Sequence, residues 1–128
     1  MSLFAKLPLP PEIVGRVVDN IVGQLKGFSE NGNTVLFGTD VGYMTDYDPT
    51  DEYVYLQRAG LSSAQILAAL TTAPAERFGV AARRGRLATG LEADIAVVEG
   101  DPERDVRALA RVRYTLRGGR VIFERVRR

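Results

Sequence analysis

The sequence predicts an α/β chain in two parts that meet near residue 80. Before that point the apolar residues recur with the helical period of about 3.6 residues. From Gly85 onward they alternate with polar residues, which is the period of strands. The Gly118-Gly119 pair separates the last two alternating runs, and a type I′ hairpin turn needs positive φ at both of its central positions. We therefore expect an α/β unit over residues 1–80 and a small antiparallel β unit over residues 81–128.

The first helix is predicted from a long series of apolar residues at helical spacing. Pro11 suits its first turn, and the Asn31-Gly32 pair provides the stop. Residues 34–38 are short, apolar and bounded by turn residues, a pattern typical of a fully buried strand in a parallel sheet. The apolar residues of the helix are Ile13, Val14, Val17, Val18, Ile21, Val22, Leu25 and Phe28.

Two further helices are expected before residue 80. One covers about residues 51–59. The next begins at Ser62, because Ser62 and Gln65 have the spacing of a capping box. Pro74 interrupts this helix and restarts a short turn that ends at Gly79. After that point the predicted elements are strands, over residues 85–87, 94–98, 112–117 and 120–124.

The composition excludes several kinds of site, because the 128 residues include no His and no Cys. A Ser-His-Asp or Cys-His arrangement, a zinc site with His ligands and a disulfide framework are impossible within this chain. No apolar run approaches the roughly 18 residues of a membrane-spanning helix, and the N-terminus lacks the layout of a signal peptide. We therefore expect a soluble cytoplasmic protein that makes no membrane contact.

The C-terminal end is strongly basic. Residues 103–128 contain nine Arg and three acidic residues. This is either a nucleic-acid surface or one solvated face of a strand pair. The alternation of these Arg residues with apolar residues favours the solvated face, so nucleic acid is not the expected partner. The residues concerned are Arg107, Arg111, Arg113, Arg117 and Arg120.

Asp40 is the candidate catalytic residue because it follows directly on the predicted buried strand. In α/β barrels the reactive groups lie at the carboxyl ends of the strands, where the βα loops gather. The alternative is a plain turn acid before Gly42. The acidic residues of the stretch 46–52 fail the register of a calcium-binding EF-hand and are expected to form a solvated loop and helix start. Side chains of the same loop are candidates for a pocket lining, with a surface loop as the alternative: Tyr43, Met44 and Tyr47.

Four segments in order resemble the C-terminal part of the metal-dependent amidohydrolases, in particular the imidazolonepropionase-like and prolidase-like members. Residues 35–40 (VLFGTD) resemble the eighth barrel strand of that family, which ends in a metal-binding Asp. Residues 59–75 are similar to its helix pair, and residues 85–98 to its segment of the form G.l.pGk.ADlvv. Residues 112–122 resemble its closing hairpin.

The resemblance implies more than the residues alone predict. It implies the last βα unit of a TIM-type (β/α)8 barrel in residues 1–80, followed by the C-terminal strands of a small β-sandwich domain in residues 81–128. It implies hydrolysis of a C–N bond in an amide, cyclic amide or dipeptide-like small molecule. Asp40 would bind the divalent metal, expected to be zinc, and take the proton of the attacking water. The His ligands of the family would lie upstream of Met1, so the chain alone is expected to hold no metal and to be inactive.

Two other expectations accompany this assignment. One βα unit of a barrel and part of a β-sandwich leave unpaired strand edges and exposed apolar faces. The chain is therefore expected to self-associate or to swap elements. The alternative function is a non-enzymatic interaction module in which the Arg-rich β unit binds a protein or a nucleic acid.

Overall fold

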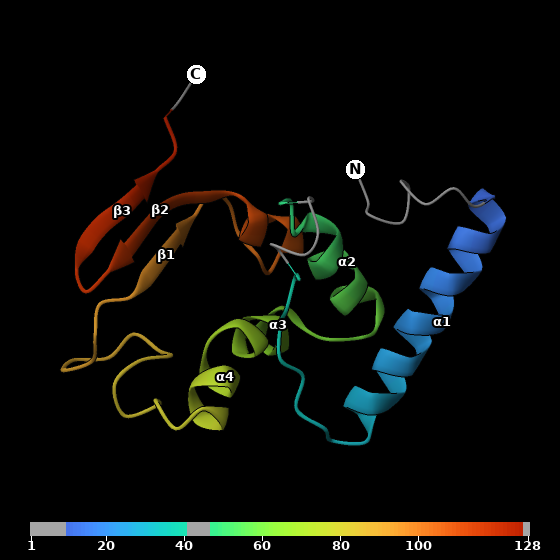
Figure 1. The fold of residues 1–128 in the computed structure, drawn as a ribbon, viewed down its shortest axis with the longest axis horizontal. Coiled ribbons are helices and arrows are strands. Elements are labelled where there is room, and N and C mark those ends of the chain that lie inside the picture. The colour runs from blue at the N-terminus through green and yellow to red at the C-terminus, as the bar shows by residue number, and fades with distance from the viewer. Residues whose placement is uncertain (1–9, 41–46, 127–128) are drawn as a thin grey trace.

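The computed structural model describes residues 10–40 and 47–126. Its helices are α1 (Pro11–Glu30), α2 (Thr50–Arg58), α3 (Ser63–Leu70), α4 (Thr72–Arg77) and the 3₁₀-helix η2 (Val106–Ala110). The strands β1 (Ile95–Val98), β2 (Val112–Arg117) and β3 (Arg120–Glu124) form an antiparallel sheet in the order β1-β2-β3. In Figure 1, α2, α3 and η2 lie in the middle of the molecule, with α1 on one side and the sheet on the other.

The long helix α1 forms where the sequence predicts it. It has Pro11 in its first turn, and the chain leaves it through Gly32, whose φ is +78°. Glycine adopts this left-handed conformation without a steric penalty, which makes it a common helix stop. Val18 is the one residue of α1 that is buried. Much of the apolar face of α1 is therefore open to solvent in the described part of the chain, at Ile13, Val17, Ile21 and Phe28.

The hydrophobic core lies between α2, α3 and η2. Ile66 from α3 is 0% exposed and Val106 from η2 is 1% exposed. The cluster joins elements on both sides of residue 80, and the Ser63 hydroxyl donates a hydrogen bond to the Pro102 carbonyl across the same boundary (3.0 Å). The division at residue 80 stays a prediction, and the packing runs continuously across it. The buried residues of the cluster are Tyr53, Leu56, Ala59, Leu61, Ile66, Val106 and Leu109.

The capping box at the start of α3 is confirmed. The Ser62 hydroxyl accepts a hydrogen bond from the Gln65 N–H (3.2 Å), and the Gln65 side-chain oxygen accepts one from the Ser62 N–H (2.8 Å). The predicted interruption at Pro74 is wrong in its position, because the break lies at Thr71, whose φ and ψ are −132° and −81°. Pro74 lies in the first turn of α4, where its missing N–H leaves no helix hydrogen bond unmade.

The closing hairpin is confirmed as well. Gly118 and Gly119 join β2 to β3 with φ values of +55° and +77°, as a type I′ turn requires. The turn is also held from outside the hairpin, because the Gly118 N–H donates to the Asp94 carboxylate (2.9 Å) and the Gly119 N–H to the Ala93 carbonyl (3.0 Å). The approach to β1 is thereby fixed against the end of the hairpin.

Two predicted strands are absent from the described residues. Residues 85–87 form a turn, because Gly85 has φ +104° and a Cβ at this position would collide with Ala75 of α4. Residues 34–38 are in no strand and are not fully buried, since Leu36 is 39% exposed. A parallel strand satisfies its backbone groups through neighbouring strands, and the described residues provide no such neighbour beside this segment. The predicted mixture of helices and strands is confirmed, whereas the barrel and the sandwich of the resemblance stay predictions.

Candidate active site around Asp40

The segment that carries Asp40, residues 33–40, lies against the core in an extended form and is called here the Asp40 segment. Its Phe37 N–H donates a hydrogen bond to the carbonyl of Ala69 in α3 (3.1 Å). The Phe37 ring stacks on the buried Tyr53 ring of α2, with the ring centroids 4.9 Å apart and the planes 19° from parallel. Val35 also packs against the core cluster. Val35 and Phe37, which alternate along the chain, therefore hold the segment against the core.

Asp40 itself is exposed at the end of this segment. Its φ is +50°, the one positive value at a non-glycine among the described residues. Asp tolerates this left-handed conformation better than most residues, because its short side chain bonds locally. The left-handed turn therefore marks the point at which the extended chain changes direction, and the carboxylate is accessible there.

Glu52 is a functional candidate that the sequence reasoning missed. Burial, and after it the negative charges of Asp51 and Asp40, raise the pKa of the Glu52 carboxyl group above its usual value of 4.5. The charge of Asp40 is the smallest of these three causes. The acidic residues between positions 46 and 52 were visible in the sequence, but nothing there indicated which of them would line a pocket.

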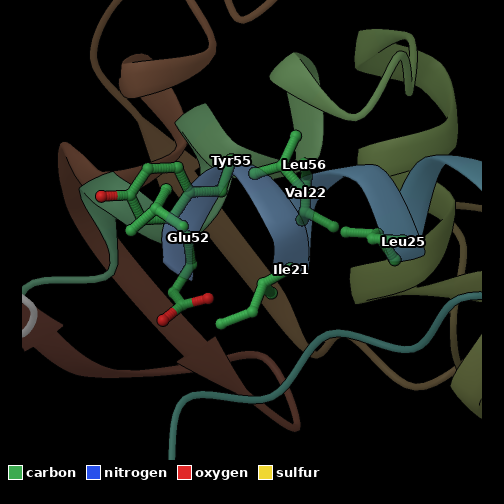
Figure 2. Close-up of a pocket in the computed structure, with 7 residues that line it drawn as sticks. Ile21, Val22, Leu25, Glu52, Tyr55 and Leu56 are labelled. Carbon is green, nitrogen blue, oxygen red and sulfur yellow. The ribbon is translucent and has the colours of Figure 1, made fainter. Parts of the chain in front are cut away.

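Glu52 also lines a pocket between α1 and α2. The cavity has a volume of about 160 Å³ and is otherwise lined by Val18, Ile21, Val22, Leu25, Tyr55 and Leu56. Figure 2 shows the Glu52 carboxylate extending beside Ile21, whereas the Tyr55 ring points the other way. The two helices are tied together at the surface by the ion pair between Arg58 and Asp19 (2.6 Å). The pocket is thus an apolar groove with a carboxylate at one side.

The residues present do not by themselves fit a catalytic metal. Among the described residues no group of three or more His, Cys, Asp or Glu side chains is placed to hold an ion. A zinc ion takes about four ligands in proteins, and Asp40 supplies one carboxylate. The role of Asp40 as ligand and proton acceptor therefore stays a prediction.

Of the side chains proposed as a pocket lining from the loop after Asp40, the structure describes Tyr47. Tyr43 and Met44 lie outside the described residues. Tyr47 is 73% exposed and is not among the residues that line the groove. In the part of the chain that the structure describes, no helix is both long and apolar enough to span a bilayer.

Several of the basic C-terminal residues contact acidic neighbours. Arg107 and Arg111 both contact the Asp105 carboxylate, at 3.5 and 3.1 Å. Arg113 is 18% exposed and lies 3.9 Å from both Glu99 and Glu124. Local neutralisation of this kind weakens the field that a phosphate backbone would meet. The arrangement does not favour the nucleic-acid alternative.

Comparison with known proteins agrees with the fold of the chain. Residues 15–123 match the amidohydrolase family. A solved Xaa-Pro dipeptidase with methionine bound in its active site superposes with a TM-score of 0.78 at 24% identity, over 94% of this chain and 30% of that one. A prolidase complexed with N-methylphosphonate-L-proline gives 0.74 at 25% identity, over 94% and 31%. No match was found among curated proteins.

A third structure, a putative prolidase from Bifidobacterium longum, is 31% identical and superposes with a TM-score of 0.72, over 88% of this chain and 28% of that one. The sequence match over most of its length shows that the chain belongs to the amidohydrolase family. It spans about 30% of the length of the solved structures that it resembles. The family is in general metal-dependent, in agreement with the cofactor expected from the sequence.

Proposed function

We propose that this chain forms the C-terminal part of a metal-dependent amidohydrolase that cleaves a C–N bond in a small dipeptide-like amide. The observation that carries the proposal is the family match over residues 15–123, which includes the Asp40 segment and its contacts with α2 and α3. The similarity to an Xaa-Pro dipeptidase and to a prolidase favours a dipeptide-like substrate over a cyclic amide.

Asp40 is assigned as one metal ligand and as the proton acceptor for the attacking water. The residue is exposed, and its backbone turns there at φ +50°, so its carboxylate is accessible to a ligand. The metal, when bound, would supply a hydroxide near neutral pH. The remaining ligands would come from residues outside the described part of the chain, and His residues would have to come from outside the chain altogether.

Glu52 is assigned a supporting role beside Asp40. The two carboxylates repel each other, and this repulsion contributes to the raised pKa of Glu52. Glu52 lines the groove between α1 and α2, whereas Asp40 is the residue assigned to the metal. Replacement of Glu52 should therefore affect activity less than replacement of Asp40.

Two experiments test the proposal. The coding sequence upstream of Met1 should contain an in-frame His-x-His pair, and the longer protein should hydrolyse an Xaa-Pro dipeptide in the presence of zinc. Asp40→Asn should abolish that activity with the fold retained by circular dichroism. The 128-residue chain should show no metal-dependent hydrolysis. An upstream sequence that lacks the pair contradicts the proposal, as does hydrolysis by the 128-residue chain that disappears in Asp40→Ala.

A further inference from the structure

β3 is the outer strand of the sheet and is open to solvent along its whole length. All of its residues are exposed, and its three central apolar side chains, Val121, Ile122 and Phe123, are 58%, 63% and 47% exposed. One edge of β3 pairs with β2, and the opposite edge faces no strand of the described residues, as Figure 1 shows. An apolar edge strand of this kind is a template for pairing with another chain.

We propose that β3 pairs antiparallel with β3 of a second copy, in a register centred on Ile122. In this register Ile122 lies opposite Ile122 of the copy, and Val121 opposite Phe123. Arg120 then lies opposite Glu124 of the copy, and Glu124 opposite its Arg120. The interface is isologous, because each contact occurs twice about a two-fold axis. The general expectation of self-association from the sequence thereby becomes a defined strand and register.

Charge selects this register over its neighbours. A shift by one residue in one direction places Arg120 opposite Arg125 of the copy, and like charges directly across a strand pair are unfavourable. A shift in the other direction places Arg120 opposite Phe123 and loses both ion pairs. The strand sequence Arg-Val-Ile-Phe-Glu is thus self-complementary when it is read antiparallel to itself.

The strand also has a feature that limits the strength of pairing. Its register with β2 passes from Phe123–Thr115 to Val121–Leu116, so Ile122 forms a β-bulge. A bulge increases the local twist and is one of the ways in which proteins protect an edge. With five residues from each copy, we expect a weak dimer, with a dissociation constant in the micromolar range.

The test exchanges the two charges and measures the dimer by sedimentation equilibrium. Arg120→Glu alone puts Glu opposite Glu, and Glu124→Arg alone puts Arg opposite Arg, so each should weaken the dimer about tenfold or more. An equimolar mixture of the two variants should dimerise again, because each chain then meets its complement. The double variant Arg120→Glu with Glu124→Arg should also recover. Arg86→Glu is the control, because Arg86 is exposed and lies outside the sheet.

Each outcome decides the matter. Recovery in the mixture and in the double variant supports the β3 pairing. A wild-type chain that remains monomeric at high micromolar concentration overturns it, and so does a dimer that the charge variants leave unchanged, because association would then use another face such as α1. Glu124 also lies 3.9 Å from Arg113 of its own chain, so circular dichroism checks each variant, and Glu124→Gln serves as the milder change. These outcomes are independent of the proposed hydrolase, which depends on Asp40.

Discussion

Two regions of the molecule differ in how much of their packing comes from the described residues. One is the centre, made of α2, α3 and η2, and the other is the Asp40 segment. In the centre Ile66 and Val106 are 0% and 1% exposed, and a capping box closes the start of α3. The Asp40 segment packs against that centre with Val35 and Phe37 half-buried and Leu36 exposed. The centre is complete within the described residues, whereas the segment with the candidate catalytic acid is supported on one side.

This difference shows where packing ends among the described residues. One side of the Asp40 segment is held by the Phe37 ring on Tyr53 and by the hydrogen bond to Ala69. The described residues provide no lateral strand partners for the segment. A site that depends on several converging groups would need these partners to hold Asp40 in a productive position.

The largest expected effect comes from a cavity in the centre. Ile66→Ala removes most of a side chain that is 0% exposed, and such changes cost about 2–5 kcal/mol of unfolding free energy. Leu67→Ala is the matched control, because the adjacent Leu67 is 51% exposed and its loss should cost less than about 1 kcal/mol. Urea denaturation followed by circular dichroism measures both. Equal losses in the two variants would show that the centre is not the stable part of the fold.

The next largest effect concerns the anchor of the Asp40 segment. Phe37→Ala removes the stack on Tyr53, and we expect a loss of about 1–2 kcal/mol from the ring pair and its partial burial. Leu36→Ala, at a position 39% exposed, should have a smaller effect. The same denaturation experiment compares the two. If Leu36 proves the costlier of the pair, the segment does not lie on the core in the way described.

The capping box gives a smaller effect of about 1 kcal/mol. Ser62→Ala removes the acceptor for the Gln65 N–H and leaves that donor without its side-chain partner. Ser62→Asp keeps an acceptor at the same place and adds a favourable charge at the helix start, so it should retain stability. If the cap contributes no stability, Ser62→Ala and the wild type will have identical denaturation midpoints.

The smallest effect is a pH dependence at Glu52. Its raised pKa means that the folded chain holds this proton more tightly than the unfolded chain, so the associated stability is present below the usual pKa of 4.5 and is lost as the pH rises through the raised value. Glu52→Gln removes this loss. The variant should be slightly more stable than the wild type at neutral pH, and the difference should close near pH ~3.5. If the stability difference between the variant and the wild type is the same at both pH values, it arises from packing and not from the ionisation of Glu52.

The sequence predicted the elements whose signals are local. The Ser62 capping box and the Gly118-Gly119 turn depend on residues within a few positions of one another, and both are confirmed. The predicted strand over residues 34–38 is absent from the structure, because a strand depends on neighbours that its own residues do not specify. For the same reason the raised pKa of Glu52 could not be predicted, since its main cause is burial produced by tertiary packing.

Native-state hydrogen exchange on the 128-residue chain tests most directly the central claim, that the centre is complete and the Asp40 segment is not. Amides of α3 should exchange most slowly, at rates near those set by global unfolding. Amides of residues 34–36 should exchange through local opening, orders of magnitude faster, with some protection at Phe37 from its bond to Ala69. Protection of residues 34–36 equal to that of α3 would contradict the claim, because the segment would then already have the partners of a strand.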